Sequence, residues 1–98
     1  MKIRIQALNF DATEQLDTYI NKKLSKIEKF FDAVQNVDVF LKVVKPESAS
    51  NKEAEIRILL PTKEIFASKT CDTFEEAIDL SVDAVDKQIR KFKEKAQK

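Results

Sequence analysis

The 98-residue sequence has no glycine, histidine or tryptophan, one cysteine and two prolines. Without glycine there is no glycine-rich loop to hold a phosphate, and without histidine there is no Cys/His cluster to hold a metal. The single Cys71 excludes an internal disulfide. It precedes a predicted helix, where a thiolate would be stabilised, but with no histidine as a base an inert thiol is the better interpretation. We therefore expect no enzymatic activity, cofactor, metal or small-molecule substrate.

Long apolar segments are also absent. No apolar run approaches the roughly 20 residues that span a bilayer. The N-terminus alternates polar and apolar residues and has no signal-peptide apolar block. Residues 1–98 suffice for one domain with one hydrophobic core. We therefore expect a single cytoplasmic domain with no membrane partner.

The apolar pattern predicts six elements. Strands are expected at about residues 2–7, 37–45, 54–60 and 64–68, and helices from Asp11 or Thr13 to about Phe31 and over residues 72–98. A polar loop at 46–51 separates the second and third strands. The predicted fold is α+β with order β-α-β-β-β-α. The first two strands should be parallel and the last three an antiparallel meander, with both helices on one face of a four-stranded sheet.

The C-terminal helix has its charges sorted by end. Asp72 is the expected N-cap, because Glu75 stands at the capping-box spacing. Acidic residues fill the first half and basic residues the second. One interpretation is that these charges complement the helix dipole and the basic end is a solvated tail. The other is that Lys87, Lys91 and Lys95 form a stripe that contacts phosphates.

The first helix supplies a second group of lysines. Lys22, Lys26 and Lys29 share one flank of its apolar stripe, with Lys23 and Tyr19 near the boundary. These lysines have no carboxylate partner on their own face, so a phosphate-binding flank stands as an equal alternative to a merely solvated one. If the helices lie side by side, the two basic groups should merge into one strongly positive groove, although the formal net charge is only +1.

The opposite face of the sheet provides the alternative. Phe40, Leu59 and Phe66 should lie there, either as ordinary cross-strand packing or as a partner surface. A protein–protein adaptor using this patch is the rival function. A single-stranded RNA binder using sheet aromatics is less favoured, because the usual RNA-recognition domain places its second helix between the third and fourth strands.

Several segments in the same order resemble one known family, the short ribosome hibernation-promoting factors, also called protein Y or ribosome-associated inhibitors. The first-helix segment is Lys23-Leu24-Ser25-Lys26-Ile27-Glu28 followed by Phe30-Phe31-Asp32, and the second-strand segment is Val37-Asp38-Val39-Phe40-Leu41-Lys42-Val43. The fourth-strand segment is Glu64-Ile65-Phe66-Ala67-Ser68, and the last helix opens with Asp72-Thr73-Phe74-Glu75-Glu76-Ala77-Ile78-Asp79 and closes with the basic run of residues 87–95.

The resemblance implies a fold similar to double-stranded-RNA-binding domains. It implies binding in the small ribosomal subunit, against rRNA and ribosomal proteins, where messenger and transfer RNA would otherwise lie, during stationary phase or starvation. The family's rRNA contacts correspond here to Lys23, Lys26, Lys87, Lys91, Lys93 and Lys95. Charge placement adds Lys22, Lys29 and Arg90. We expect a monomer off the ribosome, without the C-terminal dimerisation domain of long family members.

Overall fold

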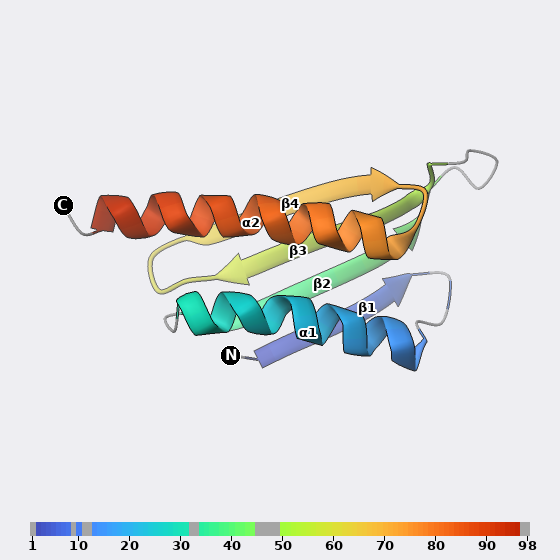
Figure 1. Cartoon of the computed structure of the whole chain (residues 1–98), viewed down its shortest axis with the longest axis horizontal. Helices are drawn as coiled ribbons and strands as arrows, with labels where there is room; N and C mark the ends of the chain where they lie inside the picture. The colour runs from blue at the N-terminus through green and yellow to red at the C-terminus, as the bar shows by residue number, and fades with distance from the viewer. Residues whose placement is uncertain (1, 9, 11–12, 32–33, 45–49, 97–98) are drawn as a thin grey trace.

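The computed structural model describes residues 2–8, 10, 13–31, 34–44 and 50–96, apart from the side chains of residues 30 and 93–96. The elements follow the predicted order: β1 (Lys2–Leu8), α1 (Glu14–Phe30), β2 (Asn36–Val43), β3 (Lys52–Leu59), β4 (Glu64–Cys71) and α2 (Phe74–Ala96). Figure 1 shows the two helices lying together over a twisted sheet.

The four strands form one sheet in the order β1-β2-β3-β4. β1 and β2 are parallel, whereas β2–β3 and β3–β4 are antiparallel, as predicted. The register aligns Ile5 with Val39, Val39 with Ile56, and Ile56 with Ala67. Because side chains alternate along a strand, this row points to one face of the sheet, which is the face that the helices cover.

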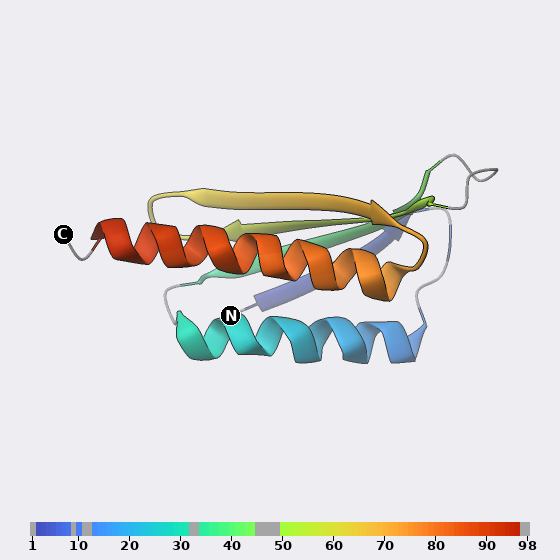
Figure 2. The same ribbon diagram turned by 45° about the horizontal axis from the view of Figure 1, so that its top comes forward.

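Both helices pack on that face, as predicted. They run side by side in the same direction, with α1 beside β1 and β2 and α2 beside β3 and β4 (Figures 1 and 2). The C-terminal turns of α2 extend past the end of α1 and past the β3–β4 hairpin (Figure 1). The basic C-terminal end of α2 therefore projects from one end of the molecule.

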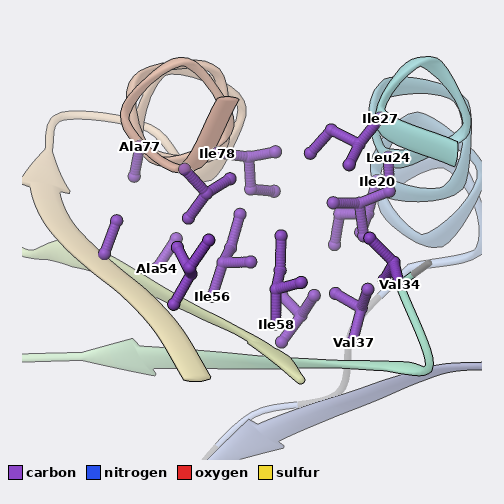
Figure 3. Packing of buried hydrophobic residues seen from close by; sticks show 14 of the residues in the cluster. Ile20, Leu24, Ile27, Val34, Val37, Ala54, Ile56, Ile58, Ala77 and Ile78 are labelled. Carbon is purple, nitrogen blue, oxygen red and sulfur yellow. The ribbon is translucent and has the colours of Figure 1, made fainter. Parts of the chain in front are cut away.

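The core lies between the sheet and the two helices (Figure 3). α1 contributes Ile20, Leu24 and Ile27, which recur at three- and four-residue steps and are at most 2% exposed. α2 contributes Ile78 and Val85, both fully buried. Each buried side chain of this size stabilises the fold by roughly 1.5–3 kcal/mol, so the apolar periodicity that predicts the helices also fixes which faces meet.

Threonine side chains cap both helices. Thr13 is the N-cap of α1, and its Oγ1 accepts a hydrogen bond from the Leu16 amide at 3.1 Å; the alternative, Asp11, lies outside the described residues. For α2 the prediction of Asp72 was wrong by one position. Thr73 Oγ1 accepts from the Glu76 amide at 3.1 Å, and the Asp72 carboxylate instead accepts a 2.6 Å hydrogen bond from the Ser50 hydroxyl.

The strand boundaries differ from the prediction around the β2–β3 connection. β2 ends at Val43 and β3 begins at Lys52, two residues before the expected start at Ala54. The Val44 amide donates to the Asn51 carbonyl at 2.8 Å, which carries the antiparallel pairing beyond the two strands. Residues 46–49 of the predicted polar loop, and Lys45 at the predicted end of the second strand, lie outside the described residues. β4 extends three residues further than predicted, to Cys71.

Candidate nucleic-acid interface

A groove between α1 and α2 collects charged side chains of both signs. α1 contributes Lys23 and Lys26 beside its buried Ile27. α2 contributes Asp79, Val82, Asp83, Asp86 and Arg90. Apart from the adjacent Val82 and Asp83, these α2 positions recur at three- and four-residue steps, and they therefore share one side of the helix. The two helices run side by side (Figure 2), and the groove lining places this side of α2 opposite Lys23 and Lys26 of α1.

Asp79 is the point where the two helices are joined by polar contacts. Its Oδ1 accepts a 2.5 Å hydrogen bond from the Tyr19 hydroxyl and lies 3.2 Å from Lys23 Nζ. Lys23 Nζ also lies 5.4 Å from the centroid of the Tyr19 ring, within cation–π range. The hydrogen bond to Asp79 and partial burial raise the pKa of Tyr19 to about 12. Tyr19 therefore stays protonated and holds the carboxylate in place.

Two further ion pairs lie along α2 at the i,i+4 spacing. Lys87 Nζ is 3.1 Å from Asp83 Oδ2, and Arg90 Nε is 3.0 Å from Asp86 Oδ2. All four side chains are at least 27% exposed. Exposed pairs of this kind contribute little to stability, about 0.3–0.5 kcal/mol on a helix. Their main effect is to place a carboxylate beside each cation.

The prediction of one strongly positive groove was wrong for the part of the chain that the structure describes. The groove is lined by three cations and three aspartates. Arg90, rather than Lys87 or Lys91, is the α2 cation that lines it with Lys23 and Lys26. At 100° per residue, Lys87 and Lys91 fall on the outward side of α2, since Asp79, Val82 and Asp86 take the side facing α1. Lys87 and Lys91 therefore lie on a surface next to the groove, and do not line it together with the lysines of α1.

The remaining predicted site residues lie around this groove. Lys22 and Lys29 are exposed on α1 and are outside the groove lining, as are the exposed Lys87 and Lys91 of α2. Lys93 and Lys95 belong to the last turns of α2, but their side chains are outside the described part of the structure. The structure thus gathers Lys23, Lys26 and Arg90, and leaves Lys22, Lys29, Lys87 and Lys91 on the outer surface of the same helical layer.

Sequence reasoning missed the aspartate partners. It treated the first-helix lysines as lacking carboxylates, because it considered only their own helix. The partner of Lys23 comes from α2, 56 positions along the chain. The pairs within α2 did have a signal in the sequence, since Asp83–Lys87 and Asp86–Arg90 stand four residues apart with the acid first.

The open face of the sheet carries the predicted apolar side chains together with an arginine. Phe66 is 45% exposed and Leu59 40% exposed, and Phe40 is partly exposed. Arg57 lies between the two phenylalanines, with its guanidinium carbon 6.0 Å from the centroid of Phe40 and 5.5 Å from that of Phe66. The Glu64 carboxylate is 3.9 Å from the same guanidinium. A charged group thus interrupts the apolar patch.

Cys71 is the last residue of β4 and is buried, at 8% exposure. Burial raises the pKa of its thiol, and the nearby Glu76 and Asp72 carboxylates raise it further. The thiolate stabilisation expected from a following helix N-terminus is therefore overcome. Among the described residues there is no group of three or more potential metal ligands, and no described helix is long and apolar enough to cross a membrane.

Fold and surface together define a small α+β domain whose two-helix layer displays cations over a mixed-charge groove. The same fold occurs in a ribosomal subunit interface protein from Coxiella burnetii, with a TM-score of 0.84 and 22% identity over 95% of this chain and 98% of that one. It also occurs in the N-terminal domain of Thermus thermophilus protein Y, with a TM-score of 0.80 and 26% identity over 94% and 99% of the two chains.

Sequence comparison gives the family. The family described as "Sigma 54 modulation protein / S30EA ribosomal protein" matches residues 3–97. The ribosome hibernation promoting factor of Pseudomonas putida is 32% identical over 97 residues, which cover 99% of this chain and 91% of that protein. The ribosome hibernation promotion factor of a Picosynechococcus strain is 34% identical over 97% of this chain and 50% of its own length. This chain belongs to the S30EA ribosomal protein family, which includes proteins named as ribosome hibernation promoting factors.

Proposed function

We propose that this chain is a ribosome-binding hibernation factor that occupies the decoding region of the small subunit during stationary phase or stress. Family membership across residues 3–97, with relatives named as hibernation promoting factors, is the observation that carries the proposal. On this account the protein acts in the cytoplasm, contacts rRNA and ribosomal proteins, and is a monomer when off the ribosome.

The helical layer is the proposed contact surface. Lys22, Lys29, Lys87 and Lys91 are exposed on it and can reach phosphates without unfolding or repacking the core. Lys23, Lys26 and Arg90 line the adjoining groove, and Lys93 and Lys95 extend the basic end of α2. Lysine contacts to phosphate position a protein without reading bases, so the shape of the folded rRNA determines where the protein binds.

Inhibition needs no chemical step. A folded domain measuring 48 × 23 × 18 Å that occupies the messenger and transfer RNA sites excludes both by its volume. Because the contacts are mostly to phosphates, the affinity should fall steeply with salt, with a logarithmic slope close to the number of phosphates neutralised.

Sedimentation with purified small subunits tests the proposal. Wild-type protein should pellet with the subunits, and a Lys87→Glu/Lys91→Glu variant should remain in the supernatant. The matched control is Lys42→Glu/Lys63→Glu, which makes the same change in net charge at two exposed lysines away from the helical layer. The control should pellet like wild type. The proposed surface is wrong if the helix variant pellets fully, or if the control is released equally.

A further inference from the structure

Three of the proposed RNA-binding cations are each held by an aspartate on α2. The pairs are Lys23 with Asp79 at 3.2 Å, Lys87 with Asp83 at 3.1 Å and Arg90 with Asp86 at 3.0 Å. The aspartates stand at positions i, i+4 and i+7, and all three line the interhelical groove. The carboxylates therefore occupy places where RNA phosphates would otherwise approach these cations.

These pairs can be exchanged for others. Their side chains are between 27% and 72% exposed, and exposed ion pairs are worth only about 0–1 kcal/mol each. A phosphate can therefore take a lysine from its aspartate at little cost in pairing energy. The displaced carboxylate, however, remains beside the phosphate and repels it. This repulsion weakens the binding of any RNA whose phosphates replace the aspartates.

We propose that Asp79, Asp83 and Asp86 compete with RNA phosphates for the cations of the helical layer, and thereby make binding selective for one folded RNA site. This inference rests on the proposed function, since it concerns the selectivity of the same surface. The aspartates are specificity-determining residues in it, although they contact no RNA favourably themselves.

Selectivity follows from how many cations an RNA engages at once. An ordinary RNA helix that lies along the groove sets its phosphates beside the three carboxylates, and their repulsion cancels much of the attraction of the paired cations. A concave RNA site also engages Lys22, Lys29 and Lys91 on the outer surfaces of both helices. Phosphates held by these outer lysines lie further from the three carboxylates, so the aspartates penalise generic RNA in the groove more than the target.

Asp83 and Asp86 are the residues to test. Asp79 also accepts the hydrogen bond from Tyr19, so changing it would alter the helix–helix contact as well as the charge. Asp83→Asn/Asp86→Asn keeps side-chain size and removes both carboxylates. The matched control, Asp38→Asn/Glu53→Gln, changes net charge by the same amount on the strands of the sheet, where neither residue contacts the groove.

Two affinities are measured for each protein at about 150 mM salt: one for a generic RNA duplex of about 20 base pairs, and one for purified small ribosomal subunits. The groove variant should bind the duplex about tenfold more tightly than wild type, because Lys87 and Arg90 lose their pairs with Asp83 and Asp86 and phosphates no longer meet those two carboxylates. The salt slope for the duplex should steepen by up to about 2. The increase in affinity for subunits should be clearly smaller, so the affinity for subunits divided by the affinity for the duplex should be lower than in wild type.

The control separates a local effect from a change in total charge, and should move both affinities little. The inference is overturned if the groove variant leaves the ratio of affinities unchanged, or if the control narrows it equally. Failure of the proposed function is a different result: wild-type protein would then bind subunits no more tightly than the duplex. That result would leave no selectivity for the aspartates to determine, and would overturn the inference as well.

Discussion

Tyr19 donates a 2.5 Å hydrogen bond to Asp79 and so joins the two helices through residues 60 positions apart. The same carboxylate oxygen pairs with Lys23, one of the three cations that line the groove. One aspartate thereby fixes the position of α1 against α2 and the direction in which a proposed RNA-binding lysine points. The helix–helix contact and the candidate interface share these atoms.

The ionisation of Tyr19 should report this contact directly. Tyr19 is the only tyrosine in the chain, so phenolate absorbance follows it alone. Its pKa is raised to about 12, first by the hydrogen bond to Asp79 and then by burial. We expect a titration midpoint near 12 in the folded protein, and a midpoint closer to 10 in Asp79→Asn. A wild-type midpoint at the ordinary value of 10 would show that the contact does not form in solution.

The free energy of unfolding should depend on whether the Tyr19 hydroxyl carries its proton. The pKa of Tyr19 is higher in the folded protein than its ordinary value of 10.0, so the folded state retains the proton longer than the unfolded chain. The resulting stabilisation is complete below pH 10 and is lost between about pH 10 and 12. The free energy of unfolding in urea is measured for wild type and for Tyr19→Phe. Lysine titration affects both proteins alike, so the difference between them reports the contribution of Tyr19. The stability difference between the two should shrink as pH rises through this window, and a constant difference would contradict the linkage.

Removing either threonine N-cap should lower the stability of the fold measurably, and by more than removing Asp72 does. Thr13→Ala and Thr73→Ala each remove a hydroxyl that accepts from a first-turn amide, and each should lower the free energy of unfolding by about 1 kcal/mol. Asp72→Ala serves as the comparison, because Asp72 bonds to Ser50 on the surface and caps no helix amide. Equal or greater destabilisation by Asp72→Ala in urea denaturation would restore Asp72 as the cap.

Phe92 should hold the projecting end of α2 against α1. Its ring meets that of Phe31 edge to face, with centroids 6.0 Å apart and planes at 85°. Phe92→Ala should cost about 1–3 kcal/mol, because Phe92 is only partly buried and loses less than a core phenylalanine. Amide hydrogen exchange should show faster exchange after Arg90, while the rest of α2 stays protected. Phe92→Leu, which keeps most of the apolar contact, should lose less; unchanged exchange in the alanine variant would refute this anchoring role.

The fold could be predicted because burial imposes a period on each element. Val37, Val39 and Leu41 alternate, and all three are fully buried. The α2 cap was misplaced because Asp72–Glu75 and Thr73–Glu76 both have capping-box spacing, and only backbone geometry distinguishes them.

The candidate site was harder to predict, because it depends on how one helix is rotated against the other. The spacing of Lys23 on its own helix carries no information about Asp79, which meets it only through tertiary packing. Arg90 was selected from its charge and does line the groove with Lys23 and Lys26. Whether these cations bind rRNA stays a prediction from charge and family resemblance.

The central claim is that the protein and the RNAs of translation compete for one site on the small subunit. Purified subunits carrying a fluorescent messenger RNA and initiator transfer RNA are titrated with wild-type protein, and with Lys87→Glu/Lys91→Glu as the binding-deficient control. We expect wild type to displace both RNAs with an apparent affinity that weakens in proportion to the RNA concentration, and the control to displace neither. Stable complexes that hold the protein and both RNAs together would contradict the account.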